Sequence, residues 1–545
     1  MVHYVYGDRN SEEGKTMKRL FLVLLILVMT VGVILGGCAE PSPTPTPTPS
    51  PTPTPAPSPT PTPPTEPSPK YGGTLKTCWE PIPPTIGWPL GMIANPAGSA
   101  VQHILETLLR ADKNGDVCPW LAESYEIADD MMSITFKLRK GIKFHDGSDF
   151  NAEVVKWNLD NWIDAKAQPF WKSVDIIDDY TVRVNLTMWR NTVPLSFCEG
   201  IAPVLMISKE AFDKNGMEWV QVNPVGTGPF KFVSFTPDVS LKAVKNPDYW
   251  VEGKPYLDAV EITFIGDPTT MEMMLKSGDI DMGGTNLNKA AGYEELGFNV
   301  FVTPEAIWNL VPDTANPDSP WANKKVREAV EYAIDRESIA KILGYGYLEA
   351  PYQIAPRSSL AYDPDFPWKR KYDPEKARQL LSEAGYPDGF DTTIIIFPPA
   401  GDDYILLVQA YLSQVGIKVN LEHTDFGKWG TYMGPGSWPE NACLYSPIPR
   451  FDKSFRGGIQ FTFGMFGQSW LRTPEMMQTV DAALGTLTVD IDKIRAFDEL
   501  VGRDALLIPV HEGTWNRVTA PYAHTTFDER GYILYWNIED AWLDK

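Results

Sequence analysis

Apolar and polar residues alternate in several short stretches of the chain, a pattern typical of strands that bury one face. Residues 70–78 are predicted to form a first strand, and residues 182–186 a later one. The alternation of residues 134–138 resumes in residues 142–144 after Gly141, which predicts a β-hairpin. The chain therefore contains strands with a buried and an exposed face.

Other segments place apolar residues three and four positions apart, as amphipathic helices do. Residues 99–110 and a segment that starts at Asn151 follow this pattern. Aspartate or asparagine before a helix, proline at its first position and glycine after its end are the expected boundary residues. Three further helices carry such signals, at Asp267-Pro268 with Gly278, at Asn323, which opens a long helix, and at Asp373-Pro374 with Gly385.

A strand, a helix and a second strand follow one another at residues 393–397, 403–414 and 417–421. Strands separated by a helix of this length are joined by a crossover, so they lie parallel in one sheet. The sequence therefore predicts an α/β fold.

The N-terminal segment is typical of an export signal. Lys18 and Arg19 precede the apolar run 20–35, and Leu35-Gly36-Gly37-Cys38 follows it. This ending resembles a bacterial lipobox, which predicts that residues 1–38 are a signal peptide and that Cys38 is lipidated. The alternative is an uncleaved membrane anchor. Both interpretations place the body outside the cytoplasm, in the periplasm or at the cell surface, on the outer face of the cytoplasmic membrane.

Residues 39–69 alternate proline with threonine and serine. Proline fixes φ and removes a backbone donor, so this stretch cannot build a helix or a sheet. It is predicted to be a disordered, extended spacer, which reaches on the order of 90 Å at the rise of a polyproline helix.

The size and charge of the remaining body limit its function. From Lys70 onward it has about 475 residues, enough for two or three lobes. The net charge of −22 disfavours nucleic acid as a partner and favours a cationic or neutral ligand. No cysteine pair has metal or redox spacing, and the six histidines do not cluster, so no metal and no cofactor are predicted.

Eight segments, in their order along the body, resemble the family 5 extracellular solute-binding proteins, the dipeptide, oligopeptide and nickel-binding group of ABC importers. The similarity runs from about Gly72 to Pro509. The segments are Gly72–Leu75, Pro119–Tyr125, Phe136–Gly147, Val225–Phe230, Asn246–Trp250 with Lys254–Asp258, Ser277–Asp281, Val326–Glu337 and Tyr372–Phe390.

This resemblance implies a two-lobed, type II periplasmic-binding-protein-like α/β fold with an extra subdomain in the first lobe. Lobe I is expected at residues 70–310 and 505–545, with the subdomain at 116–205, and lobe II at 311–504. It also implies a monomer that holds a small, peptide-like ligand in the cleft between the lobes. ABC permease subunits then receive the ligand, and no reaction is catalysed.

Several family motifs suggest chemistry but are better explained as parts of the fold. Phe144–Gly147 (FHDG) has the residues of a turn rather than a catalytic His-Asp pair. Gly226-Thr227-Gly228 lacks the spacing of a phosphate-binding loop. Arg327, Glu331, Asp335 and Arg336 are spaced for ion pairs on a helix, either on a solvated face or stabilising the fold.

Candidate ligand contacts come from loops and from the chain near the crossing between lobes. Trp79 and Trp88 flank the Pro/Gly-rich loop after the first strand, and Trp308 lies near the crossing. Segment 438–467 occupies the region where peptide-binding members place an aspartate for the peptide amine. That pattern is not recognisable here. Three residues of this segment are the candidates in its place, namely Asp452 as the substitute and Arg450 or Arg456 as partners of a carboxylate.

Two other functions remain open from the sequence. One is a surface sensor or adhesin with the same fold and no transport. The other is a surface hydrolase, which lacks support because neither a G-x-S-x-G nor an H-E-x-x-H motif is present.

Overall fold

The computed structural model describes residues 68–80, 85–92, 100–112, 115–198, 204–398, 400–432, 438–450, 452–465, 469–526 and 537–545. The predicted signal peptide, Cys38 and almost all of the predicted spacer lie outside these residues. No helix among the described residues is both long enough and apolar enough to cross a membrane.

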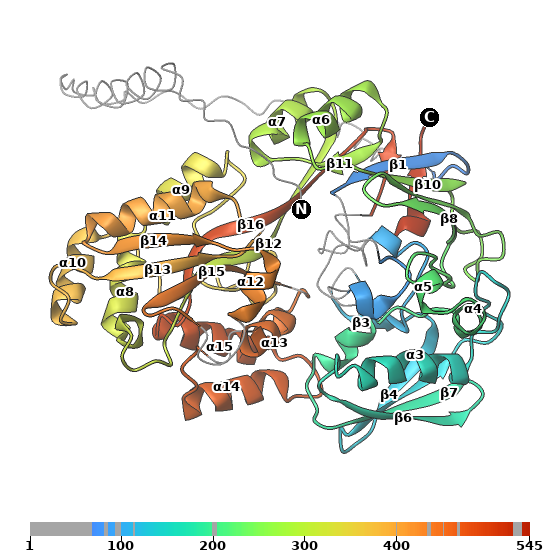
Figure 1. Ribbon diagram of the computed structural model, residues 1–545, viewed down its shortest axis with the longest axis horizontal. Coiled ribbons are helices and arrows are strands. Elements are labelled where there is room, and N and C mark those ends of the chain that lie inside the picture. Colours follow the sequence, from blue (N-terminus) through green and yellow to red (C-terminus); the bar gives the residue numbers. More distant parts are fainter. Residues whose placement is uncertain are drawn as a thin grey trace, which may run out of the picture. The chain divides into compact units, whose positions relative to one another are not determined.

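A ten-stranded mixed sheet runs through the described chain (Figure 1). We call β11, β1, β10, β9 and β8 the β1 group, and β15, β13 and β14 the β13 group. The long strands β12 and β16 lie between the two groups. In spatial order the strands are β14 (Lys418–His423), β13 (Asp391–Ile396), β15 (Ala442–Pro449), β12 (Asn299–Pro312), β16 (Ile508–Thr519), β11 (Met282–Gly284), β1 (Thr74–Trp79), β10 (Ala259–Phe264), β9 (Ser240–Lys245) and β8 (Phe230–Thr236).

The β13 group contains the predicted strand-helix-strand unit. β13 pairs parallel with β14, and α11 (Asp402–Gln414) connects them. Ile394 and Ile396 of β13 pack with Ile405 and Val408 of the helix in one buried cluster. The α/β prediction is therefore confirmed in this part of the chain.

The β1 group also contains a parallel pair, β1 with β10, and the predicted capped helix follows β10. This helix, α6 (Pro268–Ser277), begins after Asp267, whose side chain accepts a hydrogen bond from the backbone N–H of Thr270. It ends at Gly278, whose φ of 78° lies in the left-handed region. Helix α7 (Leu287–Glu295) comes next.

A separate four-stranded antiparallel sheet lies between β3 (Val117–Pro119) and the short helix η2 (Val193–Phe197) in the sequence. Helix α3 (Ala152–Asp164) packs on it and starts at Asn151, as predicted. In spatial order its strands are β4 (Ala122–Ile127), β5 (Ser133–Leu138), β7 (Thr181–Leu186) and β6 (Trp171–Asp178).

The predicted hairpin of residues 134–144 is wrong, because β5 pairs with β4 and β7 rather than with residues 142–144. The second part of the alternation forms a tight turn instead. The backbone N–H of Gly147 donates to the carbonyl oxygen of Phe144, and Lys143 forms a single bridge with Asp149. The turn interpretation of FHDG is confirmed.

The predicted helix 99–110 is also wrong. In the described chain only residues 100 and 101 are helical, and β2 (Leu109–Ala111) begins near the end of the predicted range. The carbonyl oxygens of His103 and Ile104 accept hydrogen bonds from Phe230 and Gly228 instead of from a following helical turn. The apolar residues of this segment are buried because the backbone of a distant segment packs against it.

The predicted long helix after Asn323 is two helices. α8 (Lys324–Ala333) ends where Ile334 adopts an extended conformation, and α9 (Arg336–Leu343) follows. Arg327 of α8 is buried and donates to four carbonyl oxygens, those of Trp321, Ala322, Asp504 and Ala505. Arg327 was predicted to form an ion pair, either on a solvated face or stabilising the fold. The structure shows a buried side chain that stabilises the fold through these hydrogen bonds.

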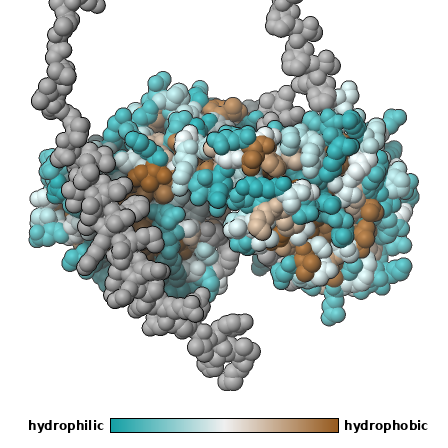
Figure 2. All heavy atoms as spheres, turned by 90° about the horizontal axis from the view of Figure 1, so that it is seen from above, coloured by the Kyte–Doolittle hydropathy of each residue, from teal (hydrophilic) through white to brown (hydrophobic). Residues whose placement is uncertain are grey.

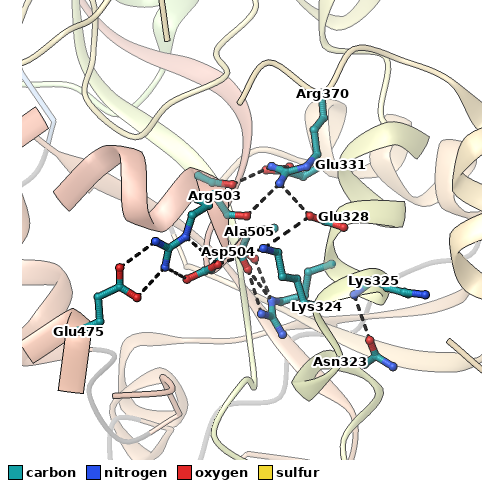
Figure 3. A network of polar contacts seen from close by, with 12 residues as sticks. Asn323, Lys324, Lys325, Glu328, Glu331, Arg370, Glu475, Arg503, Asp504 and Ala505 are labelled. Atoms are coloured by element: carbon teal, nitrogen blue, oxygen red, sulfur yellow. Dashed lines mark hydrogen bonds and ion pairs between the residues drawn. The ribbon is translucent and has the colours of Figure 1, made fainter. Parts of the chain in front are cut away.

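The same region holds a network of charged residues (Figure 3). Arg370 contacts Glu331 at 2.6 Å and Glu328 at 3.0 Å, both on α8. Arg503 contacts Glu475 at 2.8 Å and Asp504 at 2.7 Å. The network joins α8 to α15 (Ile491–Arg503) and to α14 (Pro474–Leu484), which together cover the β13 group.

The remaining elements are short or lie outside the sheets. α10 starts after Asp373 and is followed by Gly385, with a φ of 93°, as predicted. The face shown in Figure 2 is mostly hydrophilic, with apolar residues in small separate groups. The other described elements are η1 (Pro89–Met92), α4 (Lys209–Asn215), α5 (Met217–Val220), η3 (Pro320–Ala322), α10 (Pro374–Glu383), α12 (Phe426–Thr431), α13 (Arg456–Met465), β17 (Ala523–His524), η4 (Ile538–Asp540) and β18 (Trp542–Leu543).

Candidate ligand-binding site

The strands β12 and β16 position the candidate site. They pair antiparallel from Asn299 with Thr519 to Leu310 with Ile508. β15 pairs only with residues from Ala306 onward, and β11 pairs only with residues from Arg517 onward. Between these points, residues 302–304 and 514–516 form a two-stranded ribbon whose side chains are all at least partly exposed.

A group of two tryptophans and one arginine lies where β1 and β16 end beside this ribbon. The guanidinium carbon of Arg517 lies 5.2 Å from the ring centre of Trp79 and 5.6 Å from that of Trp515. Trp79 is buried and Trp515 is 37% exposed. Trp79 was a predicted contact, whereas Trp515 and Arg517 were not predicted.

Arg450 lies in a second group, and its contacts differ from the prediction. It is 1% exposed and its Nη2 donates to both carboxylate oxygens of Glu305, each at 3.1 Å. Burial raises the pKa of Glu305, and the charge and hydrogen bonds of Arg450 act in the opposite direction and favour the carboxylate. Because its guanidinium already holds a carboxylate, Arg450 acts as a support for the junction of β12 with β15.

Asp452 and Arg456, two other predicted contacts, lie at the start of α13. Asp452 accepts hydrogen bonds from the backbone N–H groups of Ser454 at 2.9 Å and Gly457 at 2.7 Å. These contacts stabilise the first turn of the helix. Arg456 is buried, its Nε lies 3.8 Å from Asp452, and that nitrogen has no hydrogen-bond partner among the described residues. The structure thus leaves one enclosed donor of Arg456 without a hydrogen-bond partner in the described part of the chain.

Trp88 and Trp308, the remaining predicted contacts, pack among other aromatic rings. Trp88 lies 5.6 Å from Phe212 and 6.2 Å from Trp157, between ring centres. Trp308 lies 4.9 Å from Tyr445 and stacks on His511 at 5.7 Å. Of the predicted contacts, Trp308 lies on β12, Trp79 ends β1, and Arg450, Asp452 and Arg456 follow β15. Trp88 packs against the core of the β1 group.

Gly115 and Tyr125 lie near the segment between β15 and α13 and the first residue of α13. A Cβ atom on Gly115 would lie 2.9 Å from the Cβ of Lys453. The pKa of Tyr125 is raised, mainly by burial, and the positive charge of Arg456 acts on it in the opposite direction. Tyr125 and Arg456 therefore face each other closely enough for their charges to interact.

A third set of contacts lies at α14, and we call it the rim contact. The backbone N–H of Asn191 donates to the carbonyl oxygen of Leu484 at 2.7 Å, and its Nδ2 donates to that of Ala483 at 2.8 Å. The indole N–H of Trp189 donates to the carbonyl oxygen of Thr486 at 3.0 Å. The rim contact therefore satisfies carbonyl groups that the end of a helix leaves without partners.

A small hollow beside β12 is the other candidate site. Its lining includes Ile307, Arg357, Glu349 and Glu512. Arg357 contacts both Glu349 and Glu512 at 2.8 Å, so its guanidinium already has two carboxylate partners. This hollow is therefore a poorer site for a charged ligand than the group around Arg517.

Comparisons with known proteins agree with this architecture. The sequence model of the bacterial extracellular solute-binding proteins, family 5 Middle, matches residues 116–477, more than half of the chain. Two solved structures share the fold. The dipeptide-binding protein of Pseudoalteromonas sp. SM9913 in complex with Met-Leu has a TM-score of 0.72 and 21% identity, over 87% of this chain and 100% of that one. The DppA protein of Helicobacter pylori, in complex with the peptide STSA, has a TM-score of 0.71 and 22% identity, over 87% of this chain and 99% of that one.

Curated relatives are more similar in sequence. The glutathione-binding protein GsiB of Escherichia coli O1:K1 / APEC is 34% identical over 345 residues, which cover 61% of this chain and 65% of the relative. GsiB of Salmonella typhimurium is 33% identical over 344 residues, with the same coverage. The chain thus spans less than two thirds of the length of these relatives. The fold is the predicted two-lobed α/β fold of periplasmic binding proteins. The chain belongs to family 5 of the bacterial extracellular solute-binding proteins.

Proposed function

We propose that the protein captures a small peptide or a peptide-like solute such as glutathione between its two lobes and delivers it to the permease of an ABC importer. The observation that carries this proposal is the 34% identity with a protein named for glutathione binding. Two proteins of the same fold are named with bound peptides, which supports the same ligand class.

In this proposal lobe I consists of residues 70–310 and 505–545, with the subdomain at 116–205, and lobe II of residues 311–504. The candidate site then lies between the lobes, where clefts for small molecules are common. The ligand favours the closed arrangement only as far as it binds that arrangement more tightly than the open one. The rim contact, between the subdomain and lobe II, belongs to the closed arrangement.

We also propose that Cys38 carries a lipid that holds the protein on the outer face of the cytoplasmic membrane. The support is the order of a basic pair, an apolar run and the Leu-Gly-Gly-Cys ending. Labelling with a palmitate analogue tests it in a bacterial host that lipidates such cysteines. The wild-type protein should incorporate label and Cys38→Ser should not. Equal labelling of both would exclude Cys38 as the attachment site.

Native mass spectrometry of the freshly purified protein tests the ligand. A bound mass that matches glutathione or a short peptide is expected. A thermal-shift screen with glutathione, dipeptides, oligosaccharides and Ni²⁺ follows, and a ligand at 100 times its Kd adds about 2.7 kcal/mol to the free energy of unfolding. Only the peptide class should raise Tm. A shift with Ni²⁺ or an oligosaccharide alone would contradict the proposed ligand.

A further inference from the structure

Arg517 is partly buried, and it differs from the buried arginines in how few partners it has. A guanidinium carries five N–H donors. Arg517 makes one hydrogen bond to the described part of the chain, from Nη1 to the carbonyl oxygen of Asn516 at 3.4 Å, and forms no ion pair with a described carboxylate. Arg327, by contrast, makes five hydrogen bonds. Most donors of Arg517 therefore have no acceptor in the described part of the chain, and a ligand that displaces solvent can supply one.

The surroundings leave space at the guanidinium. Arg517 pairs in register with Gly284 of β11, and a Cβ atom on Gly284 would lie 3.5 Å from Nη1. A larger residue at position 284 would extend toward the guanidinium. Glycine therefore leaves room there for a ligand group.

The two tryptophans hold the guanidinium without using its donors. A cation above an aromatic ring is attracted to the face of that ring. Contact with the ring faces of Trp79 and Trp515 uses none of the N–H donors, which stay available for a planar, two-oxygen acceptor. Carboxylates have that geometry.

The electrostatic environment favours an incoming anion. Burial lowers the pKa of Arg517 to about 10, and the charge of Glu80 works in the opposite direction. Glu80 is exposed and lies outside ion-pair distance. Thr77, two residues before Trp79 on the same face of β1, has a buried hydroxyl without a hydrogen-bond partner among the described residues. A charged, poorly paired group in this environment gains most from an anionic partner.

We propose that Arg517, held between Trp79 and Trp515, is a subsite that binds a carboxylate group of the ligand. This inference rests on the proposed peptide-like ligand and specifies which of its groups is recognised. It departs from the expectation of a cationic or neutral ligand, because a local positive group in the site outweighs the overall acidic charge of the protein.

Isothermal titration calorimetry on the full chain, purified in detergent, tests the subsite. The probes are glutathione and the dipeptide Met-Leu, each compared with the analogue in which every carboxylate is an amide. The wild-type protein should bind at least one acid form about 10- to 100-fold more tightly than its amide, the range expected for hydrogen bonds to a charged group. Arg517→Gln should lose this preference and bind the amide as the wild type does.

Two controls keep the result interpretable. Arg183→Gln changes an exposed arginine on β7 of the four-stranded sheet and should bind like the wild type. Arg517→Lys keeps the charge but not the planar pair of donors, and it should retain only part of the preference. It also replaces Arg517→Gln in the comparison if the glutamine variant does not fold.

The outcomes separate this inference from the proposed function. A wild-type protein that binds acid and amide equally, or an Arg517→Gln variant that still prefers the acid, overturns the subsite and leaves the peptide assignment intact. Equal weakening of acid and amide in the variant also overturns the subsite, because it shows a general structural loss. A wild-type protein that binds neither probe overturns the proposed function together with this inference.

Inorganic phosphate serves as a further probe. If phosphate binds in the wild type and is lost in Arg517→Gln while the carboxylate preference is unchanged, the group recognised is a phosphate, and the carboxylate assignment is overturned. Absence of phosphate binding, together with loss of the acid preference in the variant, supports a carboxylate subsite.

Discussion

The side chain of Asn191 donates a hydrogen bond of 2.8 Å from Nδ2 to the carbonyl oxygen of Ala483, although 292 positions separate the two residues in the sequence. Asn191 is 1% exposed, and its backbone N–H donates to the neighbouring carbonyl of Leu484. A single residue of the β3–η2 region thus completes the end of α14. The contact is specific enough to hold the two regions in one arrangement.

The variant Asn191→Ala should weaken the rim contact. Removal of one partner leaves the buried carbonyl of Ala483 unsatisfied, which costs about 1–3 kcal/mol. We expect a larger radius of gyration of the ligand-free protein in small-angle X-ray scattering, and weaker ligand binding. The control Asn185→Ala removes hydrogen bonds to Ser173 and Asp175 within the four-stranded sheet and should leave the radius unchanged. An unchanged radius and affinity for Asn191→Ala would contradict the role of the rim contact.

The variant Arg450→Met should be strongly destabilised. It leaves Glu305 buried without its partner, and breaking a buried pair in this way costs about 3–5 kcal/mol in the free energy of unfolding. The double variant with Glu305→Gln should recover part of that loss, because the remaining group is neutral. Urea unfolding at pH 7 measures both. The exposed pair of Arg378 with Glu375 is the control, and Arg378→Met should cost less than about 1 kcal/mol.

His511 should make stability depend on pH. Burial lowers its pKa to about 3, and its Nδ1 faces the carbonyl of Glu512 while Nε2 faces the hydroxyl of Tyr445. The carbonyl fixes the proton on Nδ1, so Nε2 accepts from the tyrosine. Between pH 6.5 and 3 the unfolded chain binds a proton that the folded chain does not, so this residue's contribution falls as the pH falls and is constant above pH 6.5.

The comparison of wild type with His511→Gln isolates this effect. Asp498, whose pKa burial raises to about 7, contributes in the opposite direction in both proteins. Urea unfolding between about pH 4.5 and 7.5 should show a stability difference that shrinks by about 1.4 kcal/mol per pH unit below about pH 6.5. The exposed residue His423 provides the control, since His423→Gln should leave the wild-type profile unchanged. Parallel profiles for wild type and His511→Gln would refute the prediction.

Gly226 should not tolerate a side chain. A Cβ atom there would collide with the carbonyl oxygen of Ile104, the same atom that accepts the hydrogen bond from Gly228. Gly226→Ala should therefore lose about 1–3 kcal/mol or more through overpacking. Gly292 lies inside α7, and a Cβ atom there would meet nothing within 4 Å, so Gly292→Ala should gain about 0.5–1 kcal/mol. Differential scanning calorimetry measures both changes, and equal Tm values for the two variants would contradict this account.

Local signals along the sequence predicted those parts of the fold that local interactions determine. The helices after Asp267 and Asp373 begin and end as expected because their capping residues act within one turn. The β13–α11–β14 unit follows from its spacing in the same way. Residues 99–110 contain a helical pattern, yet hydrogen bonds from Phe230 and Gly228 decide their conformation. No local signal announces such long-range partners.

The candidate site was harder to predict for the same reason. Arg450 was expected to contact a ligand, but Glu305, which lies 145 positions earlier, occupies its guanidinium. Arg517 was not predicted, because its shortage of partners is visible only in three dimensions. One signal was present in the sequence: Trp515 and Arg517 are two positions apart in a strand and therefore share a face.

In the short ribbon, β12 and β16 have only each other as neighbours, so the sheet is narrowest there. Strand pairs change their twist more easily than they slide, so a rotation there keeps the backbone hydrogen bonds of the sheet. Displacement grows with distance from a pivot. A ligand that touches Arg517 lies close to this ribbon, whereas α14 is drawn far from β11 in Figure 1. A small rotation within the ribbon would therefore move α14 over a larger distance than the residues around Arg517.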